Sequence, residues 1–202
     1  MIMSRKIILW AVISGLLAGL LGAFIFERFD NINTKEKLIK EFYNIENAVY
    51  VSPHGLRGKM DKGTNDYILV DLRSYEEYEK EHIIGAINIP AYKDKNTPAY
   101  EEIDRIVNAF RELGANKDII VYCYSIPCMT GRKIGKLLAD NGIYVKHLGI
   151  GWNEWRYYWN LWNHEHEWNI TKTQDYVWQG SDAGIPKLRD ATSCGVLGEL
   201  GC

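Results

Sequence analysis

Two uninterrupted apolar runs constrain the fold of this chain more than any other feature. Residues 67–70 run into Asp71, and residues 119–122 run into Cys123. A strand that is apolar at every position is typical of a sheet that is covered on both faces. Segments with helical spacing follow each run, at residues 103–113 and 131–138. This alternation predicts an α/β domain of three layers with a mainly parallel sheet.

Residues that start and stop helices place the elements more closely. Ser74 begins a capping box, and Thr97 with Pro98 looks like the start of a second helix. Gly114 and Gly142 stand where helices are expected to end. Shorter strands are expected at residues 48–51, 86–89 and 144–148, the last of these being the final strand.

The N-terminal segment is a separate object. Residues 7–26 carry no charge, and as a helix of about 1.5 Å rise per residue they would cross a bilayer core. Apolar regions of signal peptides are shorter and end at small residues, whereas this run ends at Phe26. The sequence therefore favours one uncleaved transmembrane helix over a signal that is removed.

The sequence constrains less strongly on which side of the membrane the domain lies. Arg5 and Lys6 favour a cytoplasmic N-terminus, which would place the domain outside the cytoplasm. Lys35, Lys37 and Lys40 follow the apolar run closely, and a plain count of cations reverses this orientation. We expect a single-pass membrane protein with an extracytoplasmic domain.

Nucleic acid is not an expected partner. The formal net charge is -2, whereas binding to phosphate backbones requires a clear basic excess.

Cys123 is the first candidate for chemistry. It stands at the carboxyl end of a buried strand, which is the edge where parallel sheets carry their sites. The loop after it leads to the N-terminus of a helix, where backbone N–H groups and the helix dipole stabilise a thiolate. Arg132 and Lys133 in the first turn of that helix suggest an anion nearby. A buried structural cysteine beside two solvated cations is the alternative.

Two longer motifs add a family resemblance. The stretch VDLRSYEEYEKEHIIGAINIPAY, residues 70–92, resembles the first signature of the rhodanese family. The stretch IIVYCYSIPCMTGRKIGKLLADNGIYVKHLGIGW, residues 119–152, looks like the active-site strand, loop and helix of that family and its final strand. The resemblance covers roughly residues 45–160. It implies the rhodanese fold and a cysteine that cycles between thiol and persulfide.

Carried over by position, the resemblance makes Cys123 the sulfur-carrying residue. It implies framework roles for Asp71, Arg73 and His82, which would fix loops by hydrogen bonds. The loop expected to cradle an anion consists of Tyr124, Ser125, Ile126, Pro127, Met129, Thr130, Gly131 and Arg132.

The loop departs from the family in its length and in holding a second cysteine, Cys128. Longer loops in this superfamily are associated with phosphatases and arsenate reductases, which carry a C-x5-R signature. After five intervening residues, Cys123 meets Met129 and Cys128 meets Ile134, so phosphate-ester chemistry is disfavoured. Cys128 is left with three roles: a thiol that resolves an oxidised or persulfidated Cys123, the nucleophile itself, or inert packing.

The last third of the chain is rich in aromatic residues. Trp152, Trp155, Trp159 and Trp162 recur at helical spacing. Packing in the core is the first interpretation, and a docking face for a protein partner or the bilayer interface is the second.

The tail carries two further groups. The histidines and glutamates at residues 164–167 are read as solvated polar side chains, and no metal site is predicted. Cys194 and Cys202 are expected to pair as a disulfide in an oxidising compartment, or to act as a mobile dithiol in a reducing one.

We therefore expect an anchor at residues 1–28, a linker helix at 29–44, a rhodanese-like domain at 45–162 and a tail at 163–202. The leading functional hypothesis is a membrane-anchored sulfurtransferase that passes sulfane sulfur from a donor, through a cysteine persulfide, to a thiol acceptor. It would need no metal or organic cofactor. The alternatives are a non-catalytic binding module of a membrane complex and a thiol–disulfide or persulfide relay.

Overall fold

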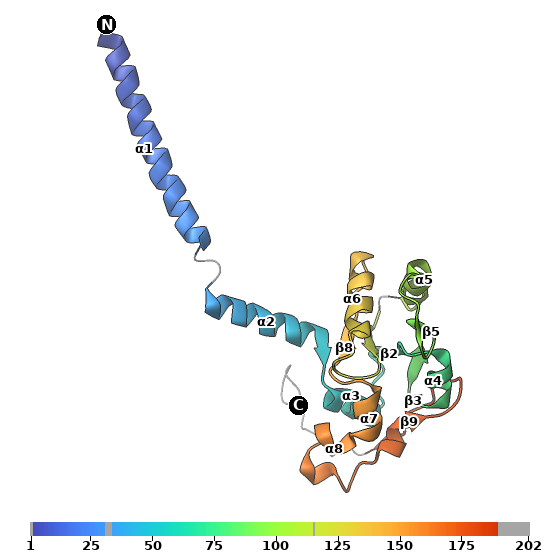
Figure 1. The fold of residues 1–202 in the computed structure, drawn as a ribbon. Coiled ribbons are helices and arrows are strands. Elements are labelled where there is room, and N and C mark those ends of the chain that lie inside the picture. The colour runs from blue at the N-terminus through green and yellow to red at the C-terminus, as the bar shows by residue number, and fades with distance from the viewer. Residues whose placement is uncertain (1, 31–33, 115, 190–202) are drawn as a thin grey trace. The chain divides into compact units, whose positions relative to one another are not determined.

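The computed structural model describes residues 2–30, 34–114 and 116–189, which fall into two compact units divided after Glu46 (Figure 1). The first unit holds α1 (Ile2–Asp30) and most of α2 (Lys35–Val49). Within α1, Ile7–Glu27 is long and apolar enough to cross a membrane, and its most apolar stretch is not buried. A signal sequence near an N-terminus passes the same test of length and composition.

The second unit is built on a five-stranded parallel sheet. Its strand order is β1-β8-β7-β2-β4, so the strand before Cys123 lies in the middle. All four pairings are parallel, and β2 and β7 align Asp71 with Tyr122 at their carboxyl ends. The strands are β1 (Tyr50–Val51), β2 (Tyr67–Asp71), β4 (Ala86–Asn88), β7 (Asp118–Tyr122) and β8 (Lys146–Leu148).

Helices cover both faces of this sheet. One face packs Leu69 and Ile120 against α3 (Pro53–Asp61), α7 (Trp152–Tyr157) and α8 (Trp159–Trp162). The other face packs Val70 and Val121 against α5 (Ile103–Glu112) and α6 (Thr130–Asp140). Neighbouring residues of each strand thus enter different apolar clusters, which explains why every position in the runs is apolar. The three-layer α/β class with a parallel sheet is confirmed.

Short elements complete the unit. Two small antiparallel sheets pair β3 (His82–Ile83) with β9 (Val177–Trp178) and β5 (Tyr92–Asp94) with β6 (Thr97–Pro98). The remaining elements are α4 (Tyr75–Lys80) and two 3-10 turns, η2 (Glu165–Glu167) and η3 (Thr173–Tyr176).

Several local predictions are confirmed. Helix α4 starts directly after Ser74, although the Ser74 hydroxyl donates to the Glu77 carboxylate at 2.7 Å instead of capping a backbone N–H. Gly114 and Gly142 follow α5 and α6 with φ of 74° and 75°, a left-handed conformation that glycine adopts without strain.

Other local predictions are wrong. Thr97 and Pro98 form β6, and the helix expected there begins at Ile103, because Tyr92 and Asp94 pair with this segment as a short ribbon. Ser52 and Pro53, directly after the strand expected at residues 48–51, open a helix that was not predicted, α3, with the Ser52 hydroxyl accepting from the Gly55 N–H. A further strand, β9, follows the one predicted to be last.

Candidate dithiol site

Two cysteine sulfurs meet at the carboxyl edge of the sheet. Cys123 follows β7 directly, and its side chain is only 2% exposed within the apolar cluster beneath α5 and α6. Cys128 lies half-buried at the far end of the loop, two residues before α6 begins. Their Sγ atoms are 3.6 Å apart, close enough for one thiol to donate to the other sulfur, and neither forms a disulfide.

Cys128 and Arg132 make three hydrogen bonds that hold the loop between the cysteines. The Cys128 N–H donates to the Ser125 carbonyl at 3.0 Å, which closes a tight turn. Arg132 donates from Nη1 to the carbonyls of Ile126 and Cys128 at 3.0 and 3.2 Å. The Arg132 guanidinium thus stabilises the conformation of the loop by binding its carbonyl oxygens.

The first residues of α7 hydrogen-bond to the start of the loop. The N–H groups of Trp152 and Asn153 donate to the carbonyls of Cys123 and Tyr124, both at 2.8 Å. Gly151 approaches so closely that a Cβ there would lie 2.2 Å from the Ser125 nitrogen. A glycine is therefore required at residue 151 for this close approach.

Thr130 connects the site to two tyrosines. Its hydroxyl lies 2.8 Å from the Tyr92 hydroxyl and 2.7 Å from the Tyr100 hydroxyl. The Tyr92 ring stands edge-on to the Tyr124 ring, at 5.4 Å between centroids. These aromatic rings form an apolar wall beside the sulfurs.

The two thiols differ in their pKa. The hydrogen bond between the two sulfurs lowers the pKa of Cys128 to about 5; burial opposes this shift, and hydrogen bonds with the Thr130 side chain and backbone support it. The pKa of Cys123 is raised, first by its hydrogen bond to Cys128 and then by burial. One proton is therefore shared by the pair, and the negative charge belongs on Cys128, at the N-terminus of α6.

This geometry bears on the expected roles. The sequence assigned sulfur transfer to Cys123, which the structure places out of solvent with a raised pKa. Of the three roles left to Cys128, that of a nucleophile requires a lowered pKa and access to solvent. Ile126 and Met129, at 44% and 54% exposure, show that the loop carrying it faces solvent.

The framework residues lie directly behind Cys123. Asp71, fully buried, accepts from the Arg73 backbone and guanidinium and from the Tyr122 hydroxyl at 2.6 Å. Arg73 also donates to the Glu81 carbonyl at 2.7 Å. His82 stacks on Tyr78, with 3.8 Å between ring centroids, and its Nδ1 bonds the Tyr78 carbonyl at 2.8 Å.

Sequence reasoning missed several residues of the site. Glu154 accepts from the N–H groups of Gly151 and Ile126, and Glu77 accepts from the Tyr124 hydroxyl. Tyr92 and Tyr100 also reach the site from a distant segment. No local pattern marks these residues as part of the site, because their contacts with Ile126, Tyr124 and Thr130 join segments far apart in the sequence.

The tryptophan stripe is core rather than surface. Trp152, Trp155 and Trp159 are 5%, 0% and 7% exposed, and Trp162 packs against them. The Trp155 and Trp162 rings stack at 5.0 Å between centroids. The burial of Trp152, Trp155 and Trp159 agrees with the packing interpretation.

His164, Glu165 and His166 are exposed, as expected of a solvated polar group, but Glu167 is not. Glu167 is fully buried and pairs with the Arg57 guanidinium, while His54 Nε2 lies 2.6 Å from its other oxygen. Metal-ligating atoms of His54, His164 and Glu167 lie within 4.8 Å of one another. Arg57 and His54 both contact the Glu167 carboxylate, so these three residues form a buried ion-pair group, with His164 exposed beside it. Cys194 and Cys202 lie outside the described residues.

Comparisons with known proteins agree with the fold. The model of the Rhodanese-like domain family matches residues 52–157, more than half of the chain. The BH2092 protein from Bacillus halodurans has a similar structure, with a TM-score of 0.50 and 23% identity over 68% of this chain and 100% of that chain.

Two curated relatives share parts of the sequence. The HTH-type transcriptional regulator Rv0324 from Mycobacterium tuberculosis is 36% identical over 44% of this chain and 34% of its own length. A probable molybdopterin-synthase adenylyltransferase from Pyropia yezoensis is 33% identical over 65% of this chain and 34% of its own length. The chain thus spans about a third of the length of these relatives. On the family match and the fold together, this chain belongs to the rhodanese-like domain family.

Proposed function

We propose that this chain is a sulfurtransferase in which Cys128 accepts sulfane sulfur and Cys123 stabilises its thiolate. The observation that carries the proposal is the pair of sulfurs 3.6 Å apart at the N-terminus of α6. A rhodanese-like domain supports sulfurtransferase activity or a related role. The half-exposed thiolate with a lowered pKa is the nucleophile that such transfer requires.

The reaction takes place in two displacements. The Cys128 thiolate attacks the outer sulfur of a donor such as thiosulfate, a new S–S bond forms, and sulfite leaves with the electron pair of the broken bond. The negative charge then lies on the persulfide, near the Thr130 hydroxyl and the first N–H groups of α6. An acceptor thiolate attacks the outer sulfur and releases the Cys128 thiolate.

The distance between the sulfurs favours a dithiol relay as the second candidate. Here Cys123, as a thiolate, attacks the inner sulfur of a persulfide on Cys128. A Cys123–Cys128 disulfide forms, and hydrosulfide leaves with the electron pair of the broken bond. The two outcomes differ in their product: a persulfide on the acceptor in the first, hydrosulfide and a protein disulfide in the second.

We further propose that Ile7–Glu27 anchors the chain in a membrane as a single span, with the second unit outside the cytoplasm. Its length, apolar composition and exposure support an anchor. Arg5, just before this apolar span, supports this orientation. Labelling of intact cells with a membrane-impermeant thiol reagent tests the side: reaction only after lysis assigns the unit to the cytoplasm.

Sulfite release tests the activity itself. The full chain is mixed with thiosulfate and a small thiol acceptor, and sulfite is measured over time for the wild type, Cys128→Ser and Cys123→Ser. We expect Cys128→Ser to abolish release, because a hydroxyl is a far poorer nucleophile at neutral pH. Activity in Cys128→Ser and its loss in Cys123→Ser would assign the nucleophile to Cys123. A wild-type chain that is folded but releases no sulfite would favour a non-catalytic binding module.

A further inference from the structure

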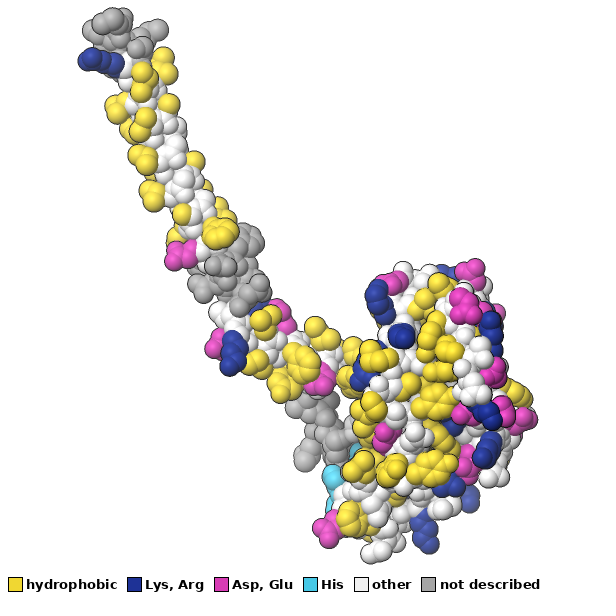
Figure 2. Space-filling model, viewed as in Figure 1, with side chains coloured by type: hydrophobic (Ala, Val, Ile, Leu, Met, Phe, Trp, Pro, Cys, Tyr) yellow, Lys and Arg dark blue, Asp and Glu magenta, His cyan; other side chains and the backbone are white. Residues whose placement is uncertain are grey.

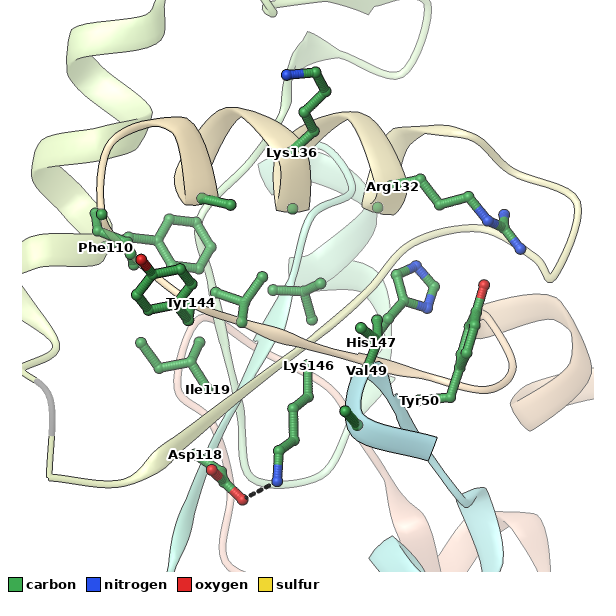
Figure 3. A pocket seen from close by; sticks show the side chains of 18 of the residues that line it. Val49, Tyr50, Phe110, Asp118, Ile119, Arg132, Lys136, Tyr144, Lys146 and His147 are labelled. Carbon is green, nitrogen blue, oxygen red and sulfur yellow. Dashed lines mark hydrogen bonds and ion pairs between the residues drawn. The ribbon is translucent and has the colours of Figure 1, made fainter. Parts of the chain in front are cut away.

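A groove of about 820 Å³ runs beneath α6, in the same unit as the dithiol site (Figure 3). It lies between α6, the end of α5 and strands β7 and β8. Its walls include Phe110, Ile119, Val121, Ile143 and Val145. Figure 2 shows a band of hydrophobic side chains on the face of this unit in view, with Lys and Arg side chains at its borders. Its volume suits a small-molecule site, typically about 300–1,000 Å³.

Helix α6 presents its smallest residues to the groove. Gly131, Gly135 and Ala139 follow one another at intervals of four and line it. At Gly131 a Cβ would lie 2.0 Å from His147 Nε2, so packing explains that glycine. At Gly135 a Cβ would meet only Val145 Cγ2, at an ordinary 3.8 Å, so packing does not require a glycine there. The absence of a side chain at Gly135 leaves space for a ligand.

One end of the groove is lined by the residues that follow the dithiol loop, although the two cysteines themselves do not line it. Gly131 and Arg132 line the groove and follow directly after Thr130, the residue that hydrogen-bonds Cys128. His147 lines the same end and is 7% exposed, and its Nε2 has no hydrogen-bond partner among the residues that the structure describes. A buried polar atom without a partner is uncommon and calls for an explanation, of which a bound ligand is one.

The other end is positively charged. Arg111, Lys117 and Lys146 lie at the end of α5 and at the starts of β7 and β8, on the sheet edge opposite the cysteines. Five cations and one carboxylate, Asp118, line the groove as a whole. The 11 residues of α6 separate the two ends by about 16 Å, at about 1.5 Å per residue.

We infer that this groove binds the sulfur acceptor, and that the acceptor is a thiol with a long apolar chain and an anionic group at the end away from the sulfur. The inference rests on the proposed function and names its substrate class. The thiolate end reaches the persulfide on Cys128, the chain lies against Gly135, and the anionic end meets Arg111 and Lys117. Transfer forms an S–S bond to the acceptor and breaks the one to Cys128, which leaves as the thiolate, so no oxidant is needed.

A series of acceptors tests this assignment. The full chain in lipid nanodiscs receives thiosulfate and either 3-mercaptopropionate or 11-mercaptoundecanoate, and kcat/KM is obtained from sulfite release. We expect the long acceptor to exceed the short one more than tenfold, since each buried CH₂ contributes about fourfold. Gly135→Ala, which fits the groove, keeps this ratio. Gly135→Leu fills the groove and brings the ratio close to one.

Two further variants make the outcome decisive. Ala139→Leu blocks the groove one turn later and replaces Gly135→Leu if thermal melting shows that the latter is unfolded. Lys117→Glu raises KM for 11-mercaptoundecanoate severalfold, whereas Lys80→Glu on α4, outside the groove, does not. Sulfite release with equal ratios in Gly135→Ala and Gly135→Leu overturns the acceptor assignment alone. Absence of sulfite with every acceptor overturns the proposed function and this inference together.

Discussion

The Sγ atoms of Cys123 and Cys128 lie 3.6 Å apart, although one cysteine belongs to the apolar interior and the other to an exposed loop. This contact makes the two thiols a single titrating unit. The proton stays on the buried sulfur and the charge lies on the outer one, where α6 begins. The buried cysteine thereby supplies a hydrogen-bond donor that an isolated loop thiol would lack.

The reactivity of Cys128 should appear at low pH. Its pKa is lowered to about 5, first by the hydrogen bond from Cys123, so the thiolate is present above that pH and lost below it. We expect the rate of alkylation at Cys128 to reach half its plateau near pH 5. Bromobimane labelling between pH 4 and 9, with the modified residue identified by mass spectrometry, measures this midpoint. A midpoint near 9 shows that the sulfur pair does not share its proton.

Removal of the buried donor should raise this midpoint. Cys123→Ala deletes the group that stabilises the Cys128 thiolate, so the pKa of Cys128 rises and its alkylation at pH 6 slows. Cys123→Ser retains a donor and is the matched control, with a smaller rise expected. Equal midpoints in both variants and the wild type would place the origin of the low pKa elsewhere, at Thr130 or the N-terminus of α6.

The sequence specifies the local frame of the candidate site, but not how its two sulfurs meet. The strand end, the loop and the helix that follows are local features, and residues 119–138 specify them directly. The proton shared by Cys123 and Cys128 depends on how the longer loop folds back, with Arg132 binding its carbonyls. This loop conformation depends on contacts with Glu154 and Gly151 from another segment, which no local pattern encodes.

Loss of the carboxylate behind the site should destabilise the domain strongly. Asp71→Ala leaves the Arg73 guanidinium buried without its partner and removes the acceptor for the Tyr122 hydroxyl. Breaking a buried ion pair in this way costs about 3–5 kcal/mol in the free energy of unfolding. Urea denaturation measures the change. Lys136→Ala, which removes an exposed pair with Asp140, is the control and should unfold at the wild-type urea concentration.

The tryptophan cluster should act on stability rather than on binding. Trp155 is fully buried among Trp159, Trp162 and Tyr176, so Trp155→Ala should cost about 3–5 kcal/mol. Tyr157 in the same helix is 62% exposed, and Tyr157→Ala should leave the free energy of unfolding nearly unchanged. Equal stability of the two variants would contradict the assignment of this stripe to the core.

Errors in the fold prediction arose where tertiary pairing overrides local preference. Thr97 and Pro98 have the residue types of a helix start, yet pairing with Tyr92 and Asp94 makes them a strand. Val177 and Trp178 form a strand only because His82 and Ile83 lie beside them. The strands at the long apolar runs were predicted correctly, because burial on both faces requires an apolar residue at nearly every position.

Locating the transferred sulfur tests the central claim most directly. The full chain is exposed to thiosulfate, freed of donor, alkylated, digested and examined by mass spectrometry, in parallel for the wild type, Cys123→Ser and Cys128→Ser. Our account predicts one added sulfur atom on Cys128 in the wild type and in Cys123→Ser, and none in Cys128→Ser. An added sulfur on Cys123, retained in Cys128→Ser, would contradict the account.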